Sequence, residues 1–392
     1  MPRRLPEGVE HPVVRGAQSV RSLIPMGMAT LLPDTAQRVR ELEGRVFSCF
    51  TQWGYREIIP PTFEYLDVLS SGLPPEVLEK CYKFADWSTG RILVLRPDVT
   101  AQIARIVAMG MAGKGLPLRL SYRTTVYRYE PEHAGRDREI FQIGIELIGQ
   151  DTASMDAEIL SLLIETLSLI GLPEYKISLG HVGFFQALLA KSKLSVQGRK
   201  QAELAAAHKD IPRLEAILQR ERVSKKEAKV ILETPGRYGG EEVLRWGKKV
   251  AGRNRQLLHP IERLEQVYRL LETTDRAGCL LLDLGEFRGF DYYDGLVFDV
   301  FSPGVGCELG GGGRYNHLIG RFGRDIPSTG FALDVDRLFG ALEGIDGGRS
   351  SNSAPILLVN AKRQFGAGFQ LAQQVRSSGF SLIHETVEST NA

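Results

Sequence analysis

The chain has 392 residues, of which 43% are hydrophobic and 24% charged, with a net charge of +2. This length predicts two or three domains, and the balanced charge gives no argument for a nucleic-acid or membrane-surface partner. Four distant cysteines without a CxxC pair, no signal-peptide segment and no apolar run near ~20 residues predict a reduced, cytoplasmic protein without metal or cofactor.

The first predicted elements are a long amphipathic helix and a short strand. Asp34 is a possible helix N-cap, and apolar side chains recur on one helical face as far as Trp53. Gly54 ends the helix, and residues 55–59 form a strand that Pro60 stops.

A second strand, residues 92–95, turns into a helix that runs from Asp98 to about Met109. Asp98 could cap this helix, or it could present a carboxylate to a cationic ligand. The cap is the simpler role, and both stay open at this point.

Residues 118–149 predict two strands around a polar loop. On the second strand Gln142, Gly144 and Glu146 share one face, because side chains repeat with a period of two. Unpaired polar groups are costly to bury, so this face either meets water or lines a binding site. The glycine leaves room above the sheet, which favours the binding site.

The middle of the chain is predicted to contain a helix and a strand before it becomes entirely helical. Residues 157–170 predict a helix and 175–180 a strand, whereas 184–273 predict a helical insertion without strands. Its basic part, residues 191–229, contains interspersed acids and lacks aromatic residues, which favours solvated helix faces over an RNA surface. Residues 280–284 return the chain to the sheet.

Residues 286–316 contain an alternating apolar strand around 296–300 and four glycines at 310–313. The glycines predict a flexible loop. Together with nearby Arg, Asp and Tyr side chains, this stretch suits a pocket for a small polar ligand, although an ordinary hairpin with a Gly-rich turn is also compatible. Residues 328–338 predict a strand followed by a helix.

The composition of residues 346–353 is typical of a linker. It separates a core of residues 1–345 from residues 354–392, which predict a single truncated βαβ segment.

From about Gly27 to Leu342 the chain resembles histidyl-tRNA synthetase, a class II synthetase. The resemblance is carried by motif 1 (54–64), motif 2 (127–142), motif 3 (330–337) and two histidine signatures (288–293 and 312–315). It implies an α+β fold, with an antiparallel sheet flanked by helices, and a homodimer formed through motif 1.

The resemblance also implies a histidine pocket. In it Asp98 and Glu146 would hold the ligand's ammonium or imidazole N–H groups, and Arg128 with Arg288 would hold its carboxylate. The implied histidine-binding residues are Asp98, Thr100, Arg128, Gln142, Glu146, Arg288, Tyr292 and Tyr293.

The nucleotide half of the site departs from the synthetase pattern. Ile140 replaces the Phe that stacks on adenine, the aromatic moves to Phe141, and Asp334 replaces a Gly near the triphosphate. A shift of one residue puts the ring on the opposite strand face. In the amino-acid half, Asp98 replaces a Glu. The residues that remain form a vestigial nucleotide site: Glu130, Arg136 and Arg337.

Together with the abbreviated carboxyl terminus, these departures resemble the synthetase-like regulatory subunits of ATP phosphoribosyltransferase, the first enzyme of histidine biosynthesis. The resemblance implies a non-catalytic protein that acts with a short-form catalytic subunit and confers histidine feedback inhibition. The enzyme alternative is a truncated synthetase-like protein that activates histidine with ATP. A tRNA-binding module is a third, which the near-neutral charge disfavours.

Overall fold

The computed structural model describes residues 24–25, 27–111, 113–129, 138–286, 292–346 and 356–388. The chain divides into two compact units, residues 1–345 and residues 346–392. The larger unit contains all the motifs described above, and the smaller contains the carboxyl-terminal strands and helix.

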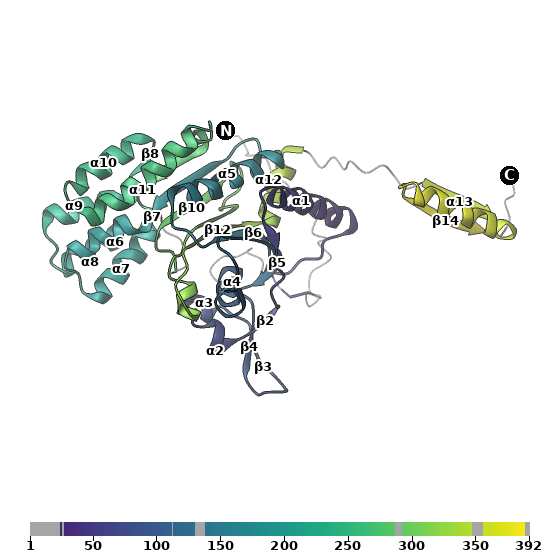
Figure 1. Ribbon diagram of the computed structural model, residues 1–392, viewed down its shortest axis with the longest axis horizontal. Helices are drawn as coiled ribbons and strands as arrows, with labels where there is room; N and C mark the ends of the chain where they lie inside the picture. The colour runs from purple at the N-terminus through teal and green to yellow at the C-terminus, as the bar shows by residue number, and fades with distance from the viewer. Residues whose placement is uncertain are drawn as a thin grey trace, which may run out of the picture. The chain divides into compact units, whose positions relative to one another are not determined.

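A sheet of nine strands in the described part of the chain forms the centre of the larger unit. The strands are β1 (Arg56–Glu57), β5 (Leu118–Tyr127), β6 (Glu139–Ile148), β7 (Lys176–His181), β8 (Tyr238–Gly239), β9 (Leu280–Asp283), β10 (Leu296–Phe301), β11 (Gly310–Arg314) and β12 (Ser328–Asp334). Their order is β1-β5-β6-β12-β11-β10-β7-β9-β8, and all described pairs are antiparallel except β1/β5 and β7/β9. The predicted antiparallel sheet with flanking helices is confirmed (Figure 1).

Strand β6 shows how the sequence divides the two faces of this sheet. Ile143 and Ile145 are buried in the main apolar core. Gln142 and Glu146 point to the other face, because neighbouring residues in a strand alternate. The polar face predicted from the sequence therefore lies opposite the core.

The core face is covered by α1 (Pro33–Gln52), α5 (Ala153–Leu169) and α12 (Val335–Asp346). Helix α1 begins at Pro33 with Leu32 as its N-cap, so the prediction that Asp34 caps it is wrong. Proline suits the first helical position because it lacks an N–H, and Asp34 lies in the first turn beside the positive helix end. None of the described helices is both long and apolar enough to cross a membrane.

The opposite face carries smaller elements. They are β2 (Phe63–Tyr65), α2 (Leu66–Leu69), α3 (Pro75–Glu79), β3 (Lys83–Ala85), β4 (Ile92–Leu95), α4 (Val99–Ile106), the π-helical turn η1 (Val107–Met111) and the 3-10 turn η4 (Ile319–Phe322). Strands β2, β4 and β3 form a separate sheet that projects from the body (Figure 1). Val99 and Ile103 of α4 belong to the same buried apolar cluster as Tyr122 and Tyr292, and this cluster holds the start of α4 above the polar face of β6.

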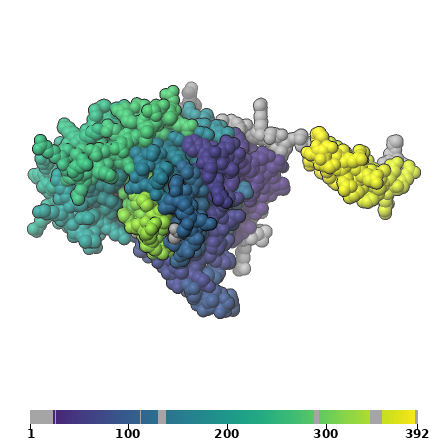
Figure 2. All heavy atoms as spheres, viewed as in Figure 1, coloured from purple at the N-terminus to yellow at the C-terminus, as the bar shows by residue number. Residues whose placement is uncertain are grey.

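Six helices form a helical lobe beside β7 and β9. They are α6 (Val182–Lys191), α7 (Val196–Ala207), α8 (Ile211–Arg220), α9 (Lys225–Glu233), α10 (Glu241–Ala251) and α11 (Arg255–Glu272), with 3-10 turns η2 (Thr234–Gly236) and η3 (Ala277–Cys279). Figure 2 shows this lobe in teal and green at the left. The expectation that the segment lacks strands is wrong, because the two-residue strand β8 pairs with β9. So short a strand has no periodicity to detect.

The glycine run 310–313 is a strand rather than the predicted loop. Strand β11 lies between β10 and β12, and a Cβ at Gly312 would stand 2.0 Å from the Gly330 carbonyl oxygen. A Cβ at Gly310 would stand 2.3 Å from the Ala332 carbonyl oxygen, and its φ of +151° also favours glycine. The glycines therefore permit a close approach of strands instead of chain mobility.

The smaller unit is a parallel strand pair with one helix. It contains β13 (Ile356–Ala361), the 3-10 turn η5 (Lys362–Gln364), α13 (Phe365–Ser377) and β14 (Leu382–Val387), and β13 pairs with β14 in parallel. The predicted strand–helix–strand order is confirmed. Large apolar side chains of this unit, such as Leu357 and Phe380, stay exposed.

Candidate functional site

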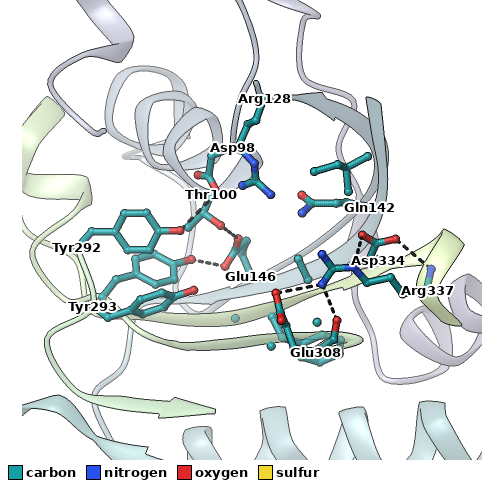
Figure 3. Close-up of a pocket in the computed structure, with 17 residues that line it drawn as sticks. Asp98, Thr100, Arg128, Gln142, Glu146, Tyr292, Tyr293, Glu308, Asp334 and Arg337 are labelled. Atoms are coloured by element: carbon teal, nitrogen blue, oxygen red, sulfur yellow. Dashed lines mark hydrogen bonds and ion pairs between the residues drawn. The ribbon is translucent and has the colours of Figure 1, made fainter. Parts of the chain in front are cut away.

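A polar pocket lies above the face of β6 that carries Gln142 and Glu146, between α4, β11 and β12 (Figure 3). It brings together most of the histidine-binding residues predicted from the sequence, which are Asp98, Thr100, Arg128, Gln142, Glu146, Tyr292 and Tyr293. Arg337, from the predicted vestigial nucleotide site, lines it as well. Arg288, Glu130 and Arg136 lie outside the described residues.

Polar side chains crowd this pocket. The cavity volume open to a water-sized sphere is about 70 Å³, within a hollow of about 650 Å³ that includes open solvent. A cavity of about 70 Å³ is larger than one water molecule needs but smaller than the volume of an amino acid. Entry of such a ligand therefore requires side chains to move, and Figure 3 shows the long Arg128 side chain pointing into the pocket.

The structure confirms one of the two roles that the sequence left open for Asp98, the helix cap, and places its side chain at the pocket wall. One carboxylate oxygen accepts a hydrogen bond of 2.8 Å from the Ala101 amide, so Asp98 is the N-cap of α4. The other accepts a bond of 3.4 Å from the Tyr292 hydroxyl and lies at the pocket wall. Asp98 is 7% exposed, and the cap fixes its orientation.

Glu146 is the most deeply buried carboxyl group of the pocket, with 1% exposure. Thr100 donates a hydrogen bond of 2.8 Å to Oε1, and the Tyr315 hydroxyl donates to Oε2. Burial raises the pKa of Glu146 to about 8, although both hydroxyl donors favour the ionised form and oppose this rise. A cationic ligand group beside Glu146 would stabilise its carboxylate.

Tyrosine side chains form one wall of the pocket. The ring centroids of Tyr292 and Tyr293 lie 4.7 Å apart, and those of Tyr292 and Tyr315 lie 5.9 Å apart in an edge-on arrangement. Burial raises the pKa of Tyr292 and Tyr315 well above the usual value, and nearby carboxylates add to the effect. These rings stay neutral at ordinary pH and act as hydrogen-bond donors.

The space expected above Gly144 is filled by protein. A Cβ at Gly144 would lie 2.6 Å from the Tyr122 hydroxyl oxygen and 2.5 Å from the Phe331 carbonyl oxygen. The glycine does leave room above the sheet, but the buried Tyr122 takes it. Gly144 therefore makes room for Tyr122 and does not line the pocket.

The far end of the pocket contains an ion-pair cluster formed by Glu308, Asp334 and Arg337. The Arg337 guanidinium lies 3.2 Å from the Asp334 carboxylate and 3.0 Å from the Glu308 carboxylate. Asp334 also accepts hydrogen bonds from the backbone amides of Asp336 and Arg337, which fixes the start of α12. Arg337, which the sequence assigns to the vestigial nucleotide site, is thus paired with two carboxylates.

The electrostatics of the cluster agree with its geometry. Burial raises the pKa of Asp334, and Arg337 opposes this rise. For Arg337 burial lowers the pKa, but the two carboxylates outweigh it, so the net shift is upward.

The predicted displacement of the aromatic ring on β6 is confirmed. Ile140 lines the pocket, whereas Phe141 lies on the opposite face, where it packs against the main core. No aromatic ring of β6 therefore faces the pocket in the described part of the chain.

Two of the polar residues that line the pocket, Tyr315 and Glu308, were not among the predicted site residues. Tyr315 belongs to a recognised signature, and its position directly after the glycine strand was a usable signal. Glu308 lies in the segment before β11 and meets Arg337 only through the fold, so no local pattern could reveal it.

Comparisons with known proteins agree with the family resemblance seen in the sequence. A family model described as histidyl-tRNA synthetase matches residues 27–338. The ATP phosphoribosyltransferase regulatory subunit of Geobacter metallireducens is 36% identical over 94% of this chain and 85% of its own length. That of Moorella thermoacetica is 36% identical over 92% of this chain and 91% of its own length.

Solved structures give the same result for the fold. A crystal structure from Bacillus halodurans, titled as an ATP phosphoribosyltransferase regulatory subunit/histidyl-tRNA synthetase, has a TM-score of 0.84. It is 27% identical and covers 96% of this chain and 95% of its own. Histidyl-tRNA synthetase from Nostoc, with 18% identity and a TM-score of 0.75 over 95% and 88% of the two chains, shares the fold.

Proposed function

The chain belongs to the histidyl-tRNA synthetase family and, within it, to the ATP phosphoribosyltransferase regulatory subunits, and on this premise we propose that its pocket binds free histidine as a regulatory ligand. The observation that carries the proposal is the burial of two carboxyl groups, Asp98 and Glu146, in a pocket that Arg128 also lines. A zwitterion with an additional N–H donor complements this set of charges.

The ligand's nitrogen groups would lie against Glu146 and Asp98, and its carboxylate against Arg128. Charge-assisted hydrogen bonds are stronger than neutral ones, and both carboxyl groups are held by hydrogen bonds from neighbours that fix their orientation. The tyrosines and Gln142 would orient the imidazole ring, whose two nitrogens need distinct partners.

The proposed readout is histidine feedback on a short-form ATP phosphoribosyltransferase catalytic subunit, with which this chain would form a hetero-oligomer. Histidine can inhibit only if it binds the inhibited assembly more tightly than the active one. A coupling free energy of about 1–3 kcal/mol would give several-fold to about hundred-fold inhibition. A homodimer through the motif 1 region, as the family resemblance implies, would place two such pockets in each regulatory unit.

The Glu308–Asp334–Arg337 cluster supports a non-catalytic role. In a synthetase-type reaction a free arginine would contact the nucleotide's phosphates, whereas Arg337 is already paired with two carboxylates. The retained arginine is also the observation that favours the second candidate, an enzyme that activates histidine with ATP. ATP–pyrophosphate exchange in the presence of histidine distinguishes them, since robust exchange would contradict the regulatory proposal.

The direct test combines calorimetry with reconstitution. The full chain should bind histidine at one site per protomer, and Glu146→Ala should remove most of the affinity with little loss of folding. Mixed with a short-form catalytic subunit, the wild-type chain should raise turnover and make it histidine-sensitive, whereas the variant should raise turnover without that sensitivity. Failure of the chain to co-elute with the catalytic subunit, or an unchanged affinity of the variant, would contradict the proposal.

A further inference from the structure

A second cavity lies where the helical lobe meets the ends of β7, β10 and β11, apart from the pocket described above. It is lined by α6, the Arg199 position of α7, the first turns of α11 and the residues flanking β10 and β11. Its volume is about 670 Å³, which is within the range of small-molecule sites. The proposed histidine-binding function does not use it.

Two arginines at this cavity have only weak counter-charges. The Nε of Arg199 is buried without a hydrogen-bond partner in the described structure. Glu203, one turn further along α7, attracts the Arg199 guanidinium electrostatically. Arg255 reaches only Glu262, at 3.9 Å, and its side chain is 82% exposed. Because Arg255 begins α11, the positive end of that helix dipole adds to the local potential.

The carboxylates at the cavity are engaged by other groups. Asp151 accepts from Arg263 at 2.5 Å and from the Asn316 side chain at 3.0 Å. Asp294 accepts from the backbone amides of Asn316 and His317, each at 3.1 Å. These acids therefore fix the cavity wall, and these hydrogen bonds go to groups other than Arg199 and Arg255.

His181 provides a neutral donor in the same wall. It is 8% exposed, and its Nδ1 accepts a hydrogen bond of 3.1 Å from the Gly183 amide. Burial, together with nearby His259 and Arg263, lowers the pKa of His181 to about 3, so the ring is neutral and carries its proton on Nε2. Among the described residues no acceptor binds this Nε2–H.

We propose that this cavity binds a small phosphate-bearing ligand through Arg199, Arg255 and the Nε2–H of His181. A phosphate group carries about −1.5 to −2 charges at neutral pH, which matches two weakly paired guanidinium groups better than a carboxylate does. The planar fork of arginine also fits phosphate oxygens in pairs. A helix amino terminus beside the arginines completes a common arrangement for phosphate recognition.

The test is calorimetric titration of the full chain with inorganic phosphate, pyrophosphate and ribose 5-phosphate at constant ionic strength. We expect one saturable site for at least one of these probes, and the comparison distinguishes a free phosphate from the phosphate group of a larger metabolite. Arg199→Ala/Arg255→Ala should weaken binding at least tenfold. The control Arg213→Ala/Lys229→Ala removes the same charge from exposed positions of the helical lobe and should leave the affinity unchanged.

A milder variant protects the test against a folding defect. His181→Asn keeps a side-chain acceptor for the Gly183 amide but loses the Nε2–H donor, so the affinity should fall several-fold while the melting temperature changes little. Absence of saturable binding by all three probes would overturn the proposal. Equal weakening by the double variant and its control, or binding of a short RNA duplex alone, would overturn it as well.

Discussion

Gly330 of β12 lies directly opposite Glu146 of β6, and the missing side chain of the glycine is what gives the buried carboxyl group its place. A Cβ at Gly330 would stand 2.0 Å from Oε2 of Glu146 and 2.3 Å from the Ile145 carbonyl oxygen. The neighbouring strand thus determines the position of the acid that we assign to ligand binding.

Gly330→Ala should displace Glu146 and weaken histidine binding more than tenfold in calorimetry. The backbone oxygen of Ile145 cannot move aside freely, so overpacking should also cost about 1–3 kcal/mol of unfolding free energy. The matched control is Gly340→Ala at an exposed position of helix α12, where no atom lies within 4 Å of the new Cβ. It should keep full affinity and gain about 0.5–1 kcal/mol of stability. Full affinity in Gly330→Ala would show that the pocket does not depend on this space.

The pH dependence of stability should report the buried acid. In the folded chain the pKa of Glu146 is raised from 4.5 to about 8, so this group's contribution to stability is complete below pH 4.5 and is lost as the pH rises to 8. The loss is on the order of 3–5 kcal/mol for a shift of this size. Denaturant unfolding at pH 5 and pH 8 should therefore show a smaller stability loss in Glu146→Gln than in the wild type. Parallel pH profiles of the two proteins would refute the assignment.

Histidine binding should release a proton near neutral pH. A cationic ligand group favours the ionised form of Glu146, which is mostly protonated in the free protein below pH 8. The measured binding enthalpy should therefore vary with the ionisation enthalpy of the buffer, and the affinity should increase between pH 6 and pH 8. In Glu146→Gln both effects should disappear, and a buffer-independent enthalpy in the wild type would argue against contact between the ligand and Glu146.

Arg128→Ala should weaken histidine binding by about 1.5–3 kcal/mol, because a charge-assisted hydrogen bond to the ligand carboxylate is lost. Arg56→Ala, at an exposed position of β1, is a control of equal charge. Histidinol, which lacks the carboxylate, should bind the wild type and Arg128→Ala with similar affinity. A large difference for histidinol would mean that Arg128 acts on the structure of the pocket instead of on the ligand.

Removing the two carboxylate charges from the ion-pair cluster should release Arg337 for phosphate oxygens. Asp334→Asn/Glu308→Gln keeps the shapes and the α12 cap acceptor while it removes both carboxylate charges, so ATP affinity should rise several-fold. Glu174→Gln/Glu215→Gln removes the same charge from exposed positions and should have no effect. An unchanged ATP affinity in the first variant would contradict the idea that this pairing keeps Arg337 from binding a nucleotide.

Local rules predicted much of the site. The period of two on β6 put Gln142 and Glu146 on one face and Phe141 on the other, and helix-cap chemistry identified Asp98. Such features depend on residues a few positions apart, so they can be recognised in a single sequence. The family signatures placed these local features in one pocket.

The sequence by itself therefore determined the family, the sheet with its polar face, and many of the polar residues that line the pocket. Only the tertiary structure decided that the glycines of β11 are a strand, that Tyr122 fills the space above Gly144, and that Glu308 pairs with Arg337. The physical reason is the order of strands β6-β12-β11-β10, which brings together segments far apart in the chain. Contacts between such segments leave no periodic signal in any one of them.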